Sequence, residues 1–175
     1  RLDGVTGVQT CALPILIKGK SRMPLLIMFM GIVFNLANAF MQGQWIFFLA
    51  PATMYTQSWI RDTRFLLGTA LFLAGLIINI QSDGIIRNLR KDGDTNHYLP
   101  EKGLFRYVTC ANYLGEIVEW LGFAILTWSF SGFVFFLWTF ANLVPRAHAI
   151  YKKYQNDFSD EMAREPRKRV FPFIY

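Results

Sequence analysis

The centre of the chain carries a polar pattern inside an apolar run, Asn112-Tyr113-Leu114-Gly115-Glu116-Ile117-Val118-Glu119-Trp120. Asn112, Glu116 and Glu119 stand at i, i+4 and i+7, so a helix would place them on one face. The surrounding run, from about Tyr107 to Trp128, has the roughly 20 mostly apolar residues that cross a bilayer core of about 30 Å. A carboxylate inside a membrane costs about 2.5 kcal/mol or more. These acids therefore indicate either a functional site or a structural pairing with basic residues of neighbouring helices.

Three other segments have a similar apolar character. They run from about Leu25 to Leu49, where Gly43 could interrupt the helix, from about Phe65 to Ile80, and from about Gly132 to Val144. The last two are short, and we expect each to continue as helix into a polar end. Hydrophobic residues make up 53% of the chain and charged residues 17%, below the share of about 25% usual for soluble domains. Because backbone groups in lipid must bond internally, the sequence predicts an all-α integral membrane protein with four transmembrane helices.

The basic residues predict the orientation of these helices. Of the 18 Lys and Arg residues, only Arg61 and Arg64 fall in the loop between the first two spans, and Arg1 stands at the chain start. The others precede span one, lie between spans two and three, or follow span four, which predicts that these segments face the cytoplasm. The same clustering beside apolar runs argues against a nucleic-acid partner, despite a net charge of +6.

The first fifteen residues differ from the rest of the chain. Residues 1–15 have no helical period and lack the basic and apolar regions of a signal peptide. We interpret them as a non-native or disordered segment and take residues 16–175 as one domain. The two cysteines, Cys11 and Cys110, and the two histidines, His97 and His148, form no metal-binding spacing, so we expect no metal.

A second polar stripe follows the second span. Asn79, Asp83, Arg87 and Arg90 stand at i, i+4, i+8 and i+11, again on one helix face. Carboxylate and amide groups suit ribose hydroxyls, and guanidinium groups suit phosphates. Alternatively, the arginines contact anionic lipid headgroups. The polar loop from Asp92 to Pro100, which contains His97, connects the two stripes and could close over a ligand. Glycine-rich nucleotide motifs are absent from the sequence, so a membrane bundle would have to bind any nucleotide.

Several motifs together resemble those of the steroid 5-alpha-reductase family. They are Asn79-Ile80-Gln81-Ser82-Asp83, Arg87-Asn88-Leu89-Arg90-Lys91, Gly103-Leu104-Phe105-Arg106-Tyr107-Val108, the block from Ala111 to Trp120, Arg146-Ala147, Tyr154 and Pro172-Phe173-Ile174-Tyr175. Asn38 and Gln42-Gly43 are similar to a weaker family motif. The resemblance covers about residues 16–175, and the block from Asn112 to Trp120 is its most specific part.

The resemblance implies an NADPH-dependent enzyme in the membrane of the endoplasmic reticulum or, in bacteria, the inner membrane. The substrate would be a 3-oxo steroid with a 4,5 double bond, or a related enoyl lipid. By family pattern, the cofactor contacts would be Asn79, Asp83, Arg87, Arg90, Asn112, Glu116, Glu119, Arg146 and Tyr154. The family fold has seven spans, and its N-terminal helices carry the Glu and Tyr that handle the substrate carbonyl. We therefore expect this chain to be a C-terminal part that is inactive alone.

Two positions depart from the family pattern. Ile150 stands where relatives carry a histidine a few residues after Arg146, and Tyr98 stands where they carry a loop arginine. Two other functions remain open on the residues alone. One is a membrane methyltransferase of the isoprenylcysteine type, which uses S-adenosylmethionine, although the block from Asn112 to Trp120 argues against it. The other is a non-enzymatic membrane protein whose acids are structural.

Overall fold

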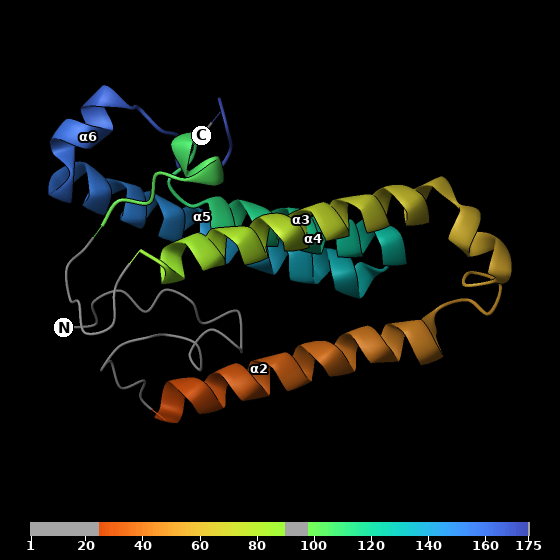
Figure 1. The fold of residues 1–175 in the computed structure, drawn as a ribbon. Coiled ribbons are helices and arrows are strands. Elements are labelled where there is room, and N and C mark those ends of the chain that lie inside the picture. The colour runs from red at the N-terminus through yellow and green to blue at the C-terminus, as the bar shows by residue number, and fades with distance from the viewer. Residues whose placement is uncertain (1–24, 90–97, 175) are drawn as a thin grey trace.

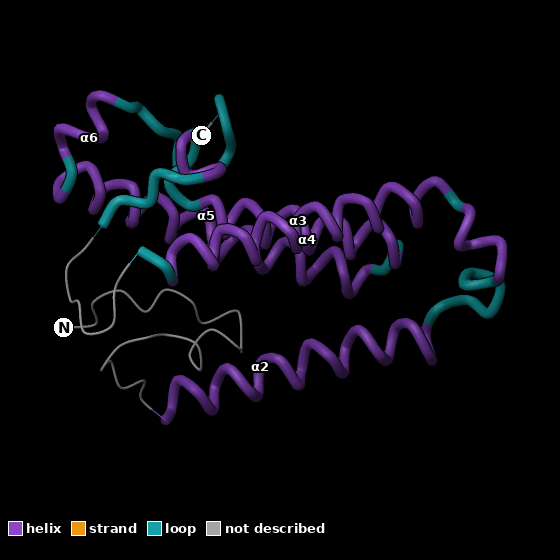
Figure 2. The backbone as a smooth tube through the Cα atoms, viewed as in Figure 1, coloured by secondary structure: helices purple, strands orange, loops and turns teal. Residues whose placement is uncertain are grey.

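The computed structural model describes residues 25–89 and 98–174, and the regular elements in these two ranges are helical (Figures 1 and 2). The elements in chain order are α2 (Leu25–Gln44), a π-helical turn (Trp45–Leu49), a 3-10 turn (Gln57–Arg61), α3 (Thr63–Arg87), a second 3-10 turn (Gly103–Arg106), α4 (Ala111–Thr127), α5 (Phe130–Asp157) and α6 (Ser159–Arg164). Predictions for residues 1–15, Arg90 and His97 lie outside the described ranges.

Helices α3, α4 and α5 lie side by side, and α2 runs along the outside of this bundle (Figure 1). Contacts between α2 and the bundle are made with α5. The ring of Phe34 lies 5.7 Å from that of Phe135 and 6.1 Å from that of Trp138. Near the other end of α2, the amide of Gln42 donates to the Ser131 carbonyl and accepts from the Ser131 hydroxyl at 2.9 Å. The buried polar side chain of Gln42 is thereby satisfied.

Among the described residues, three helical segments are long and apolar enough to cross a membrane: Met28–Leu49, Thr63–Arg87 and Phe130–Asp157. Many large apolar side chains on them are exposed, including Phe40, Leu73 and Leu137. In lipid this exposure carries no penalty, which supports an integral membrane protein. The fourth predicted span corresponds to α4, which has 17 residues and is about 25 Å long. A fourth crossing therefore stays a prediction.

Segments that were predicted to share one side of the membrane lie at one end of the bundle. The end of α3, the start of α4, the end of α5 and α6 gather there, and the loop after α2 and the α4–α5 turn lie at the opposite end (Figure 1). The helical continuation of spans two and four is confirmed, since α3 reaches Arg87 and α5 reaches Asp157. The first span is α-helical to Gln44 and then becomes a π-helical turn, which begins at Trp45, two residues after Gly43.

The predicted start of the third span was wrong. We expected helix from about Tyr107, but α4 begins at Ala111. The preceding residues are not α-helical because they pair with the C-terminal segment: the Thr109 amide donates to the Lys168 carbonyl at 2.8 Å, and the Lys168 amide donates to the Tyr107 carbonyl at 2.9 Å. A tertiary contact thus replaces the first helical turn that the local apolar run suggested.

Candidate functional site

Helices α3 and α4 touch backbone to backbone along two glycine pairs. Gly75 faces Gly115, and Gly68 faces Gly122. A Cβ atom on Gly115 would lie 2.6 Å from the backbone nitrogen of Asn79 and 2.9 Å from the Gly75 carbonyl oxygen, and one on Gly122 would lie 2.8 Å from the Gly68 carbonyl oxygen. Membrane helices use small residues in this way to let their backbones approach closely. Polar side chains beside the Gly75–Gly115 pair are therefore within reach of the opposite helix.

Two amide–carboxylate hydrogen bonds cross this contact in opposite directions. The side chain of Asn79 on α3 is hydrogen bonded to Glu119 on α4, and the side chain of Asn112 on α4 is hydrogen bonded to Asp83 on α3. Each helix supplies one amide donor and one carboxylate acceptor. Amide and carboxylate groups of the two predicted stripes therefore meet in the structure, where Asn79 pairs with Glu119 and Asn112 pairs with Asp83.

Glu116 lies between these two bonds and has only 9% of its surface exposed. Its charged neighbours are the carboxylates of Glu119 and Asp83 and the guanidinium of Arg146 on α5. Arg87 is the charged neighbour of Asp83 on its own helix. Three acids are thus gathered between two guanidinium groups. Like charges at close range in a low-dielectric setting are costly unless other groups compensate them.

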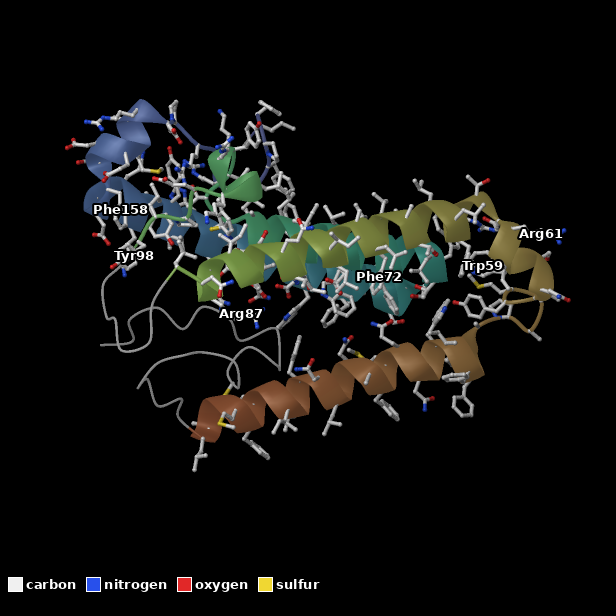
Figure 3. All side chains as sticks on the ribbon, in the orientation of Figure 1. Trp59, Arg61, Phe72, Arg87, Tyr98 and Phe158 are labelled. Carbon is white, nitrogen blue, oxygen red and sulfur yellow. The ribbon has the colours of Figure 1, made fainter. Side chains whose placement is uncertain are left out.

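The other predicted residues lie toward the polar end of the bundle. Arg87 is exposed in the last turn of α3. Tyr154 is half-buried in α5, with its ring 5.8 Å from that of Phe158 in an edge-to-face arrangement. Figure 3 shows Arg87, Tyr98 and Phe158 at this same end, away from Trp59 and Arg61. The structure thus places an arginine and aromatic residues beyond the acids.

His148 and Ile150 occupy different surroundings on α5. Ile150 packs against the apolar core that contains Leu143 and Ala147. His148 has Arg169 and Lys152 as its charged neighbours, and its Nδ1 atom is buried without a hydrogen-bond partner among the described residues. Its charged neighbours therefore do not include the acids around Glu116.

The C-terminal segment holds the start of α4 in place. In addition to the two bonds that join Tyr107 and Thr109 to Lys168, the Cys110 amide donates to the Arg169 carbonyl at 3.1 Å. Val108 and Val170 are fully buried at this junction. Ala111 follows directly as the first residue of α4. The segment therefore fixes the helix one residue before Asn112, which carries one of the two crossing hydrogen bonds.

Arg167 is a residue of this junction that the sequence analysis missed. Its side chain is 1% exposed, and its guanidinium donates to the Pro100 carbonyl and lies 3.5 Å from the Glu165 carboxylate. It therefore ties the C-terminal segment to the residues that follow the central loop. We had counted it among the cytoplasmic charges, and only its position within a basic run ahead of an apolar pair, Val170 and Phe171, could have suggested burial.

Cys110 is not a candidate nucleophile. The thiol is buried, and burial raises its pKa to about 12. A thiol with that pKa is almost entirely protonated at neutral pH, whereas the thiolate is the reactive form.

The composition of the cluster suits a polar organic ligand better than a metal ion. The ranges 25–89 and 98–174 hold no group of three or more His, Cys, Asp and Glu residues that could bind a metal. Carboxylates and amides accept and donate hydrogen bonds to hydroxyl and carboxamide groups, and Arg87 and Arg146 offer charge to phosphate groups.

Comparison with known proteins gives consistent matches. A model of the family described as 3-oxo-5-alpha-steroid 4-dehydrogenase matches residues 21–175. The chain is 43% identical over 162 residues to 3-oxo-5-alpha-steroid 4-dehydrogenase 1 of Homo sapiens, an alignment that covers 93% of this chain and 61% of the human protein. It is 40% identical over 166 residues to the Bos taurus protein of the same name, covering 95% of this chain and 63% of that protein. It is 42% identical over 156 residues to Steroid 5-alpha-reductase DET2 of Solanum lycopersicum, covering 89% and 59%. The chain thus spans about three fifths of the length of these relatives.

Proposed function

This chain belongs to the 3-oxo-5-alpha-steroid 4-dehydrogenase family, and on that basis we propose that it supplies the NADPH site for reduction of the 4,5 double bond of a 3-oxo-4-ene steroid or a related enoyl lipid. The observation that carries the proposal is the cluster of Asp83, Asn112 and Glu116 between facing membrane helices, with Arg146 beside it. Polar groups of this kind inside a membrane bundle indicate a functional site.

The donor and acceptor groups of this cluster fit NADPH. The cofactor has anionic phosphates at one part and neutral carboxamide and hydroxyl groups elsewhere. Arg87 and Arg146 match the phosphates in charge, and the carboxylates of Asp83 and Glu116 accept from hydroxyl or amide groups. A ligand amide that donates to Glu116 would also compensate this buried acid, whose carboxylate neighbours repel it. When bound, NADPH supplies the hydride that adds to the alkene carbon beta to the ketone.

Each residue then has a defined task. Asn112 orients the Asp83 carboxylate through the hydrogen bond between them, and Asn79 does the same for Glu119. Glu116 is a hydrogen-bond acceptor for the amide end of the cofactor, which it helps to orient for transfer. Arg90, by the family pattern, would contact a phosphate, and Tyr154 would contact the cofactor from α5.

The membrane setting suits the proposed substrate. Steroids and enoyl lipids partition into the bilayer, and three helical segments in the described part of the chain are apolar enough to span one. The substrate can therefore reach the bundle from lipid, while a soluble cofactor must reach it from water. We propose that the polar end of the bundle faces the cytoplasm, because the basic residues gather there.

The orientation can be tested at Asn96. A cysteine at this position, in a background without Cys11 and Cys110, should react with a membrane-impermeant maleimide only from the cytoplasmic face of intact membranes. A cysteine at Thr53, in the opposite loop, is the matched control and should react only from the other face. The reverse labelling pattern would refute the proposed orientation.

Ligand-dependent unfolding tests the cofactor. The purified full-length protein would be heated in detergent with NADPH, NADH, S-adenosylmethionine or no addition. We expect stabilisation by NADPH, since a ligand that binds only the folded state raises stability by RT ln(1 + [L]/Kd), about 2.7 kcal/mol at 100 Kd. Stabilisation by S-adenosylmethionine alone would indicate a methyltransferase, and stabilisation by neither would indicate a structural role for the acids.

Arg90→Ala tests the phosphate contact within that assay. A charge-assisted hydrogen bond contributes about 1.5–3 kcal/mol, so we expect the NADPH concentration needed for half-maximal stabilisation to rise roughly 10- to 150-fold. Lys153→Ala, an exposed basic residue of α5 at the same end, is the control and should bind NADPH normally. An unchanged requirement in Arg90→Ala would assign Arg90 to lipid headgroups instead.

A further inference from the structure

The end of the bundle opposite the acids has a loop that is tied to α4 by aromatic side chains. The Tyr55 hydroxyl donates to the Thr127 carbonyl at 2.6 Å, and the Trp59 indole nitrogen donates to the Leu126 carbonyl at 3.2 Å. The indole of Trp45 in turn donates to the Tyr55 hydroxyl at 3.1 Å. The last carbonyls of a helix have no partner within it. The loop therefore supplies donors for the end of α4 and is held in one position.

Arg64 forms an ion pair with Asp62 and lies over two tryptophan rings at this loop. Its guanidinium donates to both carboxylate oxygens of Asp62, at 2.9 and 2.8 Å, and lies 4.6 Å from the ring centre of Trp59 and 5.1 Å from that of Trp128. Hydrogen bonds from Arg64 lower the pKa of Asp62 to about 2, so the carboxylate stays ionised and balances the charge of Arg64. The positive charge that remains in the loop belongs to Arg61.

A hollow of about 480 Å³ opens beside this pair. Its lining combines three hydroxyl groups, from Thr53, Thr56 and Ser58, with the guanidinium of Arg61 and the rings of Trp59 and Trp128. The Asp62–Arg64 pair also lines it. The hydroxyls of Thr56 and Ser58 are 2.8 Å apart and exposed, and Arg61 is also exposed. Figure 3 shows Arg61 and Trp59 at this end of the bundle, away from Arg87. Because Asp62 balances Arg64, the hollow offers the net positive charge of Arg61 and several hydroxyl donors at a surface.

The position of the hollow along the spanning segments indicates the ligand that it could bind. It lies where two spanning segments end, since the first stops at Leu49 and the next starts at Thr63. Ile60, Leu66 and Trp128 around it expose 58%, 57% and 53% of their surface. Tryptophan beside exposed apolar residues is characteristic of the boundary between hydrocarbon and headgroups. The anionic group present at that depth is the phosphodiester of a phospholipid.

We propose that this hollow binds the phosphodiester of a phospholipid from the adjacent leaflet, with Arg61 as its charge partner and the Thr56 and Ser58 hydroxyls as donors. Guanidinium pairs with phosphate through two parallel hydrogen bonds, and Ile60 and Leu66 lie where the acyl chains begin. The hollow lies at the end of the bundle opposite the acids, so the proposed lipid site is independent of the proposed cofactor site.

Titration of the full-length protein in detergent with phosphatidylglycerol tests the proposal, with thermal unfolding and native mass spectrometry as readouts. We expect phosphatidylglycerol to raise the unfolding midpoint and to remain bound, and diacylglycerol with the same chains to do neither. Arg61→Gln should weaken the apparent affinity about threefold to tenfold, because an exposed charge contact is worth less than a buried one. Thr56→Val, also at an exposed position, should weaken it in the same direction.

Lys153→Gln is the matched control, because this exposed lysine lies on α5, toward the opposite end. It should leave the lipid affinity unchanged. An equal loss in Lys153→Gln and Arg61→Gln would show general attraction to headgroups and refute a site. Unchanged affinity in Arg61→Gln would refute the proposal as well. If soluble glycerol phosphate stabilised the protein as well as phosphatidylglycerol, the ligand would be a free phosphate, and the assignment to lipid would be wrong.

Discussion

Replacing Gly115 with alanine should open the contact between α3 and α4. The added Cβ atom would lie 2.6 Å from the Asn79 nitrogen, 2.9 Å from the Asn79 Cα atom and 2.9 Å from the Gly75 carbonyl oxygen. Non-bonded heavy atoms are best separated by about 3.5–4.0 Å. The helices must therefore move apart by roughly 1 Å, since these neighbours are backbone atoms that cannot rotate away. Overpacking of this kind costs about 1–3 kcal/mol.

The same movement should break the hydrogen bonds that cross the contact. Hydrogen bonds of ordinary length, about 2.9 Å, are lost once the heavy atoms separate beyond about 3.5 Å. The Asn79–Glu119 and Asn112–Asp83 bonds both join α3 to α4. We therefore expect Gly115→Ala to lower the stability and, separately, to reduce stabilisation by NADPH in the protein that remains folded.

Thermal unfolding in detergent, with and without NADPH, measures both effects. Gly31→Ala is the matched control, because a Cβ atom there meets nothing within 4 Å and the residue lies inside α2. Alanine in a helix is favoured over glycine by about 0.5–1 kcal/mol, so the control should be neutral or slightly stabilised. Wild-type stability and NADPH response in Gly115→Ala would refute the view that glycine-dependent backbone contact builds the site.

Three further predictions concern the acids and the junction before α4. Glu116→Gln removes one of three neighbouring carboxylates and keeps the shape, so the reductase proposal predicts a folded full-length protein with strongly reduced turnover; loss of expression before loss of turnover would favour a structural ion pair with Arg146. Arg167→Met removes the hydrogen bond to the Pro100 carbonyl and should cost about 1–3 kcal/mol, measured as a lower unfolding midpoint. Cys110, in a background without Cys11, should resist maleimide at pH 8 in the folded protein and react after denaturation, because burial raises its pKa to about 12; rapid labelling of the folded protein would contradict its burial.

The sequence was sufficient for much of the helical architecture. Apolar length predicted the segments that became α2, α3 and α5, and the polar stripe after Ile80 explained why α3 continues to Arg87. The spacing of Asn112, Glu116 and Glu119 indicated one helix face. Each of these inferences depends on residues within a few turns of each other, where helix geometry alone relates sequence position to space.

Features that depend on distant residues could not be predicted. Local pattern does not tell which helix faces which, so the crossing bonds from Asn79 and Asn112 required the structure. Likewise, the start of α4 at Ala111 instead of about Tyr107 follows from the pairing with Lys168, which no periodicity connects to it. Both helices carry glycines seven residues apart in the sequence. Their role in close packing becomes clear only when the structure shows that α3 and α4 approach each other at these glycines.

The pairing of Thr109 with Lys168 also sets the earliest time at which the junction before α4 can form during synthesis. The two residues are 59 positions apart, so at about 5–20 residues per second a ribosome needs roughly 3–12 s to make the second after the first. During that time α4 and α5 are synthesised while the residues ahead of Ala111 still lack their partner. The synthesis of the helices therefore precedes the pairing that completes the junction before Asn112. A chain that stopped after Asp157 would keep the three described segments that can span a membrane, but it would lack Lys168, which anchors the residues just before Asn112.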